Sequence, residues 1–342
     1  MKHHPEHFRT FEYLLFLLVT LAVMCLCICI GSVNIPLQKT LIIIRNAVAR
    51  LPQISDSAVA IILSSRLPRV LCVALSGAAL SLAGAAMQGL LKNPLADGST
   101  LGVSSGASLG AALAIAFGFS FPALPFAGTM ITAVLFAFLS LLLILGLSYK
   151  LDCSLSTNTI ILIGVIFSMF MSSAISVVVT FVPEKLKSIT FWTMGSLQGV
   201  RYQDAGLLAG TLLVFGLLIF CHARELNAFA VGEDNARHVG VNVRRTKLII
   251  LISVSILIGV CVSVGGTISF VGLVTPHMVR MIVGPNHKRL LPASAFGGAV
   301  FLLLADLVAR VALNPLELPI GVVTSLVGAV VFIFIFYRTR KG

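Results

Sequence analysis

The chain has 342 residues, a length that would suit two soluble domains of average size. Hydrophobic residues make up 58% of it and charged residues 11%, against about 45–50% and about 25% in ordinary globular proteins. A soluble core cannot bury so many apolar side chains in a chain of this length. The composition therefore predicts a membrane protein and excludes a secreted disulfide-linked domain, a disordered regulator and a nucleic-acid-binding protein.

Apolar segments long enough to cross a bilayer recur along the whole chain. A spanning helix needs about 20 apolar residues, and fewer where neighbouring helices shield it. The first apolar run exceeds the length of a signal-peptide core and no small-residue cleavage site follows it, so it is interpreted as an uncleaved span. Ten spans are expected, the eighth of them short: 13–33, 66–90, 97–117, 125–148, 157–182, 203–222, 247–268, 271–283, 291–310 and 319–337. The expected fold is an all-α polytopic membrane protein with about ten transmembrane helices.

The distribution of basic residues predicts the orientation of these spans. Ten spans place both termini on one side of the membrane, and 15 of the 24 Lys and Arg residues then lie on that side, with nine on the other. Basic residues gather in cytoplasmic loops. Both termini are therefore expected to be cytoplasmic, and the net charge of +12 needs no nucleic-acid partner.

Two connecting segments are long enough to have a role of their own. The segment 34–65 is amphipathic and is expected to be an external loop with a helix lying against the membrane. The segment 223–246 is the only sizeable hydrophilic stretch on the cytoplasmic side. No loop reaches the size of a soluble domain, so residues 1–342 are expected to form a single transmembrane domain.

Small residues recur along the second and third spans. Gly102, Gly106 and Gly110 are four residues apart, which places them on one face of a helix. Such faces let helix backbones approach closely. A lining of a translocation path is the alternative interpretation, and the spacing does not choose between the two.

The motifs of common active sites are missing from the sequence. No Lys follows a Gly, so the phosphate-binding loop of ATPases is absent, and neither HExxH nor GxSxG occurs. The seven cysteines show neither metal-ligand spacing nor a CxxC pair. The chain is expected not to be an enzyme and to bind no metal or cofactor.

Few ionisable residues fall inside the predicted spans. Asp306 and Arg310 are four residues apart and are expected to pair on one helix face. The alternative is a proton relay that uses Asp306 and His277, which would make the chain a proton-coupled secondary carrier.

Five sequence blocks carry a resemblance to a known family. They are RLPR (66–69), the small-residue block 77–111, FWTMGSLQGV (191–200), the loop block 226–243 and the long block 265–332. In this order they resemble the FecCD-type permeases, the membrane subunits of bacterial ABC importers for iron-siderophores, haem and cobalamin. The resemblance covers the chain from about residue 60 to its C-terminus.

The resemblance implies an assembly in the bacterial cytoplasmic (inner) membrane. The fold would be the ten-helix bundle of the cobalamin and iron-chelate permeases. Its partners would be a second permease subunit, as a homodimer or a heterodimer, two ATPase subunits that bind ATP and Mg²⁺, and an extracytoplasmic substrate-binding protein. The implied cargo is an iron chelate, either a siderophore or haem, with cobalamin as the alternative.

Residues at both membrane surfaces take implied roles from the same resemblance. Arg66, Arg69 and Arg310 match the positions where family members receive acidic residues of the binding protein; contact with lipid headgroups or helix capping is the alternative. The cytoplasmic segment matches the two short helices that dock into the ATPase, and an ordinary solvated loop is its alternative. The implied coupling residues are Leu226, Phe229, Gly232, Glu233, Asp234, Ala236, Arg237 and Gly240.

Within that segment each residue type suits a part of the docking element. The apolar patch would consist of Leu226, Ala228, Phe229 and Val231, and Gly232 would end the first helix. The inward face of the second helix would consist of Ala236, Val239 and Gly240, with Arg237 facing outward. Glu233 and Asp234 would begin the second helix, where the helix dipole favours acids.

The resemblance is less specific about which residues form the translocation path. Residues placed on the path or at its packed helix contacts are Gln88, Asn93, Pro94, Gly102, Gly106, Gly110, Gly266, Pro276 and His277. No cargo ligand within the bundle is assigned.

Overall fold

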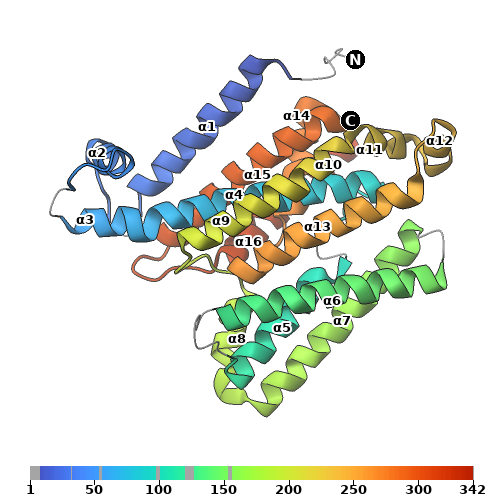
Figure 1. Ribbon diagram of the computed structural model, residues 1–342, viewed down its shortest axis with the longest axis horizontal. Helices are drawn as coiled ribbons and strands as arrows, with labels where there is room; N and C mark the ends of the chain where they lie inside the picture. The colour runs from blue at the N-terminus through green and yellow to red at the C-terminus, as the bar shows by residue number, and fades with distance from the viewer. Residues whose placement is uncertain are drawn as a thin grey trace.

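The computed structural model describes residues 8–31, 33–53, 56–97, 101–119, 127–152 and 156–341. These residues are organised almost entirely as helices (Figure 1). The elements are α1 (Thr10–Cys29), α2 (Leu37–Val48), α3 (Ser57–Ala60), η1 (Ile61–Arg66), α4 (Leu67–Leu91), α5 (Val103–Phe117), α6 (Ala127–Leu151), α7 (Thr157–Phe181), η3 (Pro183–Lys185), α8 (Leu186–Thr193), α9 (Tyr202–Thr211), η4 (Leu212–Gly216), α10 (Leu217–Cys221), α11 (Ala223–Val231), α12 (Glu233–His238), α13 (Val243–Gly265), α14 (Val271–Val283), α15 (His287–Val311) and α16 (Ile320–Lys341).

Ten apolar helical segments are found in the part of the chain that the structure describes, the number that the sequence predicted. Seven have the length and hydropathy of full spans and three are shorter apolar helices. The expected start of the third span at residue 97 is wrong, because α5 begins only at Val103. Gly102 precedes it with a left-handed backbone (φ +68°), which ends any helix arriving from the N-terminal side.

Helix α4 is the centre of the molecule. It passes among α13, α14 and α15, and most of its residues are buried, whereas most residues of α1 are not (Figure 1). Its small residues explain the close packing. A side chain on Gly77 would overlap the backbone of Gly298 in α15, and one on Gly84 would overlap the Gly272 carbonyl in α14. Two helix crossings are thus set by backbone contact.

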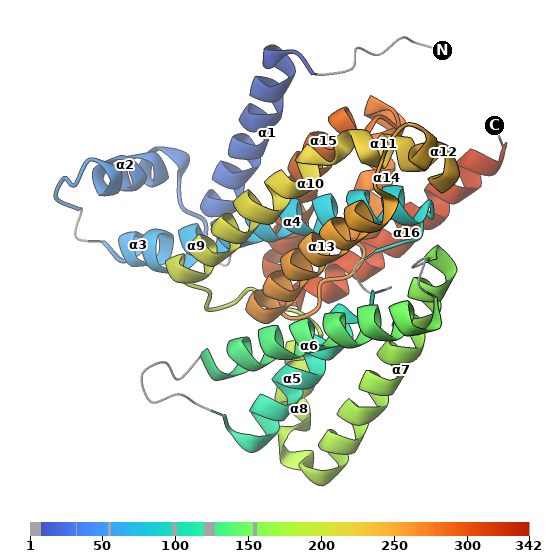
Figure 2. The ribbon, with the colours of Figure 1, turned by 45° about the vertical axis from the view of Figure 1, so that its right-hand side comes forward.

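Helices α5, α6, α7 and α8 form a second group beside α13 (Figure 2). Gly106 and Gly110 of α5 face α6, where a side chain on either residue would collide with Ser140 or with the Thr132 carbonyl. Their place in the fold is at a packed helix contact. Gly102 does not share this face, because it lies outside the helix as its N-cap.

The ends of the bundle differ in character. One end, here named the α2 end, carries α2, α3 and the starts of α4 and α9; the other, the α12 end, carries α11 and α12 (Figure 1). Helix α2 lies inside the segment 34–65 and is amphipathic, with Leu37, Leu41 and Val48 exposed along one side. An external position for this segment stays a prediction.

Helices α5 and α14 are too short to cross a bilayer. With 15 and 13 residues they are about 22 Å and about 20 Å long, against a hydrocarbon core of about 30 Å. Non-helical backbone precedes each of them, at residues 92–97 and 266–270. Irregular backbone at membrane depth requires polar surroundings inside the protein, and the cavity described below meets that requirement.

Candidate functional site

At the α2 end, two arginines cap the C-terminus of α1. The Arg66 guanidinium donates to the carbonyls of Ile28 (2.7 Å), Cys29 (3.1 Å) and Val33. Arg310 donates to the carbonyls of Cys27 (2.9 Å) and Ile30 (3.3 Å). Both arginines are buried, with 6% and 4% of their surface exposed. The geometry is that of helix capping, the alternative that the sequence left open, and a docking role for these two residues stays a prediction.

The predicted pairing of Asp306 with Arg310 is confirmed. Arg310 Nε lies 3.0 Å from Asp306 Oδ2, a charge contact whose angles are not those of a hydrogen bond. The structure adds Arg69, whose Nε and Nη2 donate to Asp306 Oδ1 at 3.0 and 2.9 Å. Asp306 thus lies between two guanidinium groups, and only 1% of its surface is exposed.

Glu317 completes this network at its more exposed side. Arg69 donates to it at 2.7 Å and Gln198 at 2.6 Å. Burial alone would raise the pKa of Glu317, but these hydrogen bonds and the charge of Arg69 hold it below its ordinary value. A cavity of about 210 Å³ opens among Gly31, Arg66, Arg69, Arg310 and Glu317.

At the α12 end, the loop between the sixth and seventh spans has the expected break. Helix α11 ends at Val231, and Gly232 follows with φ +147°, a backbone that favours glycine. Glu233 and Asp234 lie in the first turn of α12, as predicted.

The faces of these two helices differ in part from the expectation: Ala236 faces inward as predicted, whereas Leu226 and Phe229 do not face a partner. Leu226, Phe229 and Ala236 are completely buried inside this chain, so they anchor the loop to the bundle and present no patch to a partner. Of the large apolar side chains, Val231 is 72% exposed, as the predicted patch requires, and Val239 is 72% exposed although it was expected to face inward. The sequence could not show which side of a nine-residue helix the bundle would cover.

The acidic residues of α12 form two different ion pairs, one partly buried and one exposed. Glu233 forms an ion pair with Lys247 of α13 (2.8 Å), whose side chain is fully buried. Asp234 and Arg237 pair at 3.4 Å and are mostly exposed. Gly240 has φ +86° and open space around it, which suits a tight turn into α13. Lys247 was not among the predicted residues.

Helix α11 is also held by residues that the sequence did not single out. Asn227 Oδ1 accepts hydrogen bonds from the His287 backbone N–H (2.8 Å) and its ring Nδ1 (2.9 Å), and Asn227 Nδ2 donates to Asn286 Oδ1 (2.9 Å). Asn286 is the N-cap of α15. The 60 residues between Asn227 and His287 leave no local pattern that could have revealed the contact.

Gln88 joins α4 to α14. Its amide nitrogen donates to the carbonyl of Leu273 (3.1 Å), and its amide oxygen accepts from Arg280 (3.0 Å). Asn93 accepts from the Leu95 N–H (2.9 Å) in the turn after α4, and Pro94 is exposed beside it. These two residues lie at the α12 end rather than deep in the bundle.

The remaining predicted path residues lie around the break between α13 and α14. Gly266 has φ +67° and packs so closely on the Trp192 carbonyl that a side chain would overlap it. Pro276 is buried inside α14. The His277 ring packs edge-on against Phe332, with 6.3 Å between ring centroids, and belongs to no ion pair that the structure describes.

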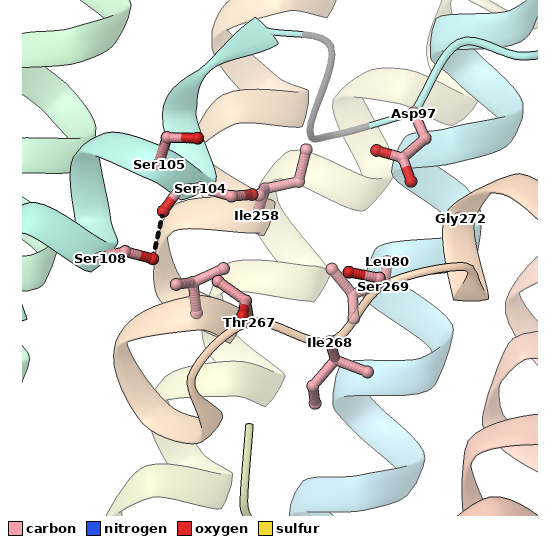
Figure 3. Close-up of a pocket in the computed structure, with 11 residues that line it drawn as sticks. Leu80, Asp97, Ser104, Ser105, Ser108, Ile258, Thr267, Ile268, Ser269 and Gly272 are labelled. Atoms are coloured by element: carbon pink, nitrogen blue, oxygen red, sulfur yellow. Dashed lines mark hydrogen bonds between the residues drawn. The ribbon is translucent and has the colours of Figure 1, made fainter. Parts of the chain in front are cut away.

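A polar cavity of about 220 Å³ lies between the two helix groups (Figure 3). Ser104, Ser105 and Ser108 of α5 line one side, and Asp97, Ser269 and Gly272 lie across the space from them, with Thr267 below. Oxygen atoms from both sides thus face a space next to the starts of both short helices, and the apolar side chains of Leu80, Ile258, Val262 and Ile268 complete its lining. The sequence indicated Gly102, Gly106 and Gly110 for the path, but the cavity is lined by the serines between them and not by these glycines.

Comparison with known proteins matches this architecture to one family. The family model described as the FecCD transport family matches residues 18–338. An uncharacterized ABC transporter permease of Bacillus subtilis is 44% identical over 282 residues, covering 82% of this chain and 80% of that protein. The hemin transport system permease of Yersinia pestis is 38% identical over 283 residues, covering 82% and 84%.

Two further comparisons extend the range of relatives. The cobalamin import system permease of Halobacterium salinarum is 36% identical, covering 82% of this chain and 74% of that protein. A solved inward-facing structure of an ABC transporter assigned to the metal-chelate type superposes with a TM-score of 0.82 at 33% identity, covering 94% of this chain and 97% of that one.

Proposed function

Because the chain belongs to the FecCD transport family and is the permease of an ABC importer, we propose that it carries an iron chelate, either a ferric siderophore or haem, into the bacterial cytoplasm. The observation that supports this choice of cargo is the similarity to a hemin permease and to a transporter of the metal-chelate type. Cobalamin is the second candidate, favoured by the similarity to a cobalamin permease.

The energy for transport comes from a separate ATPase in this proposal. The α12 end is its docking surface, with Val231, Val239, Asp234 and Arg237 exposed on the two short helices. Leu226, Phe229 and Ala236 hold those helices on the bundle. When the ATPase displaces α11 and α12, the membrane helices are therefore displaced with them. ATP and Mg²⁺ bind the ATPase partner.

The assembly contains a second permease subunit, and the α2 end faces an extracytoplasmic binding protein in this proposal. Of the three predicted docking arginines, Arg69 with its partner Glu317 is the more exposed, and Arg66 and Arg310 shape the surface from beneath. Partly exposed ion pairs contribute about 0–1 kcal/mol each, so the network orients the binding protein more than it holds it.

The contacts of Asp306 speak against a proton-coupled carrier. A relay group needs freedom to exchange its partner as it gains and loses a proton. Asp306 is instead enclosed by Arg69 and Arg310, and its nearest described partners do not include His277.

Uptake into proteoliposomes tests the proposal. The chain would be reconstituted with the ATPase and binding protein that co-purify with it, and offered a ferric siderophore, haem or cobalamin. We expect vanadate-sensitive, ATP-dependent uptake of an iron chelate that a proton ionophore leaves unchanged. Uptake of cobalamin alone would favour the second candidate, and ATP-independent uptake abolished by the ionophore would refute the importer.

A further inference from the structure

Three polar side chains connect the exposed helix α11 to the cavity between the helix groups. We propose that Asn227, His287 and Gln88 act as positioning residues that transmit movement of α11 through α4 to α14 during transport. The proposal rests on the proposed function, because an ATPase must supply the movement.

The first joint lies between α11 and α15. Asn227 makes three hydrogen bonds of 2.8–2.9 Å, two to His287 and one to Asn286, at the first turn of α15. Since Asn227 Oδ1 accepts, the Nδ1 of His287 carries the proton in this arrangement. Three directional bonds to one helix end fix the orientation of α11 as well as its position.

The second joint lies between α15 and α4. The His287 side chain is 3% exposed, and its Nε2 edge lies against the backbone of Gly89. A side chain on Gly89 would overlap that nitrogen. The space that the ring occupies on α4, here called the notch, exists only because residue 89 is glycine. The imidazole ring of His287 is hydrogen-bonded to Asn227 of α11 on one side and packed against Gly89 of α4 on the other. A displacement of α11 is therefore passed to α4.

The third joint lies between α4 and α14, one residue along from the notch. Pro276 has no N–H, so the carbonyl of Gly272 lacks its helical donor. Gln88 approaches that carbonyl at 3.5 Å, donates to Leu273 before the proline, and accepts from Arg280 after it. The Gln88 amide therefore contacts α14 on both sides of Pro276, where one helical hydrogen bond is missing.

The link ends at the cavity. Gly272 and Ser269, at the start of α14, line it opposite the serines of α5 (Figure 3). A shift of α14 relative to α5 must change the size of this space, since it lies between the two helix groups. Movement at the α12 end thus reaches the cavity through the half-buried Asn227 and the buried side chains of His287 and Gln88.

The test compares Asn227→Ala with Asn158→Ala in the reconstituted complex. Asn158 is an exposed asparagine in the first turn of α7 and serves as the matched control. We expect Asn227→Ala to lower uptake about tenfold while ATP hydrolysis stays within about twofold, since binding of the ATPase is left intact. Asn227→Asp keeps the acceptor for His287 and loses the bond to Asn286, so its uptake should lie between those of Asn227→Ala and the unaltered chain.

A reporter inside the cavity separates transmission from mere stability. Ser105→Cys, in a chain whose seven native cysteines are replaced, would be modified by a small thiol reagent with and without ATP and vanadate. We expect nucleotide to change the modification rate in the Asn158→Ala background and to leave it unchanged in the Asn227→Ala background. Melting temperature and ATPase co-purification would be measured for every variant.

The outcomes distinguish the two proposals. Equal uptake and an equal nucleotide response in Asn227→Ala and Asn158→Ala would overturn the link while the importer stands. Loss of uptake together with loss of ATPase co-purification in both Asn227 variants would also overturn it, because Asn227 would then serve assembly. Absence of ATP-driven uptake by the unaltered complex would overturn the proposed function and the link with it.

Discussion

Arg66, Arg69 and Arg310 differ in role although the sequence groups them together. Arg310 and Asp306 are one helical turn apart, and their pairing follows from helix geometry alone. The partners of Arg66 and Arg69 lie between 33 and 248 positions away in the chain. No local pattern encodes such contacts. The sequence therefore indicated which cations matter, and the fold decides that two of them cap α1.

Glycine offers a test of packing at the scale of one residue. We expect Gly84→Ala to destabilise the protein by about 1–3 kcal/mol, because the added methyl group would overlap the Gly272 carbonyl and force α4 and α14 apart. Gly210→Ala in α9 is the control, since open space surrounds that position, and alanine there should be neutral or stabilising by up to about 1 kcal/mol. Thermal unfolding in detergent measures both; equal melting temperatures would contradict the backbone contact.

Among the elements, local chemistry predicted helix ends better than helix faces. Gly232 ends α11 and the acids begin α12 because both effects act within one turn. The face of α11 that carries Leu226 and Phe229 was assigned to a partner, but the bundle itself covers it. An amphipathic pattern indicates that one face is buried without indicating what buries it.

Helix α1 should depend on its arginine caps. Arg66→Lys replaces a planar fork that reaches three carbonyls by a single ammonium, so the C-terminal end of α1 should loosen from the bundle. Cys27 reports this, because its side chain is completely buried in the folded chain. In a variant that keeps Cys27 as its sole cysteine, we expect Arg66→Lys to raise the rate of thiol modification about tenfold.

The matched control for α1 is Arg45→Lys. Arg45 lies on α2 and donates to its neighbour Asn46, so the conservative change removes no contact with α1. A modification rate of Cys27 that is the same in both variants would show that the caps do not hold α1.

For the whole molecule, the two ends of the bundle must face opposite sides of the membrane. The excess of basic residues predicts that the α12 end is cytoplasmic. A membrane-impermeant maleimide should therefore label Gln38→Cys on α2 in intact spheroplasts, and Val239→Cys after α12 only once the membrane is permeabilised. Both positions are exposed in the folded chain, so accessibility reports sidedness. Labelling in the reverse order would invert the topology and place α11 and α12 outside the cell.

The sequence by itself determined the class of protein, the number of apolar helical segments and the family, because hydropathy and motif order are properties of the chain read along its length. It also determined the end of α11, the start of α12 and the Asp306–Arg310 pair, which depend on neighbours within one or two helical turns. Only the tertiary structure decided that α5 and α14 are too short to cross the bilayer and begin beside a polar cavity, and that the His287 ring occupies the space left by the missing side chain of Gly89. Those features arise where distant segments meet, and their energies depend on contacts that no local pattern records.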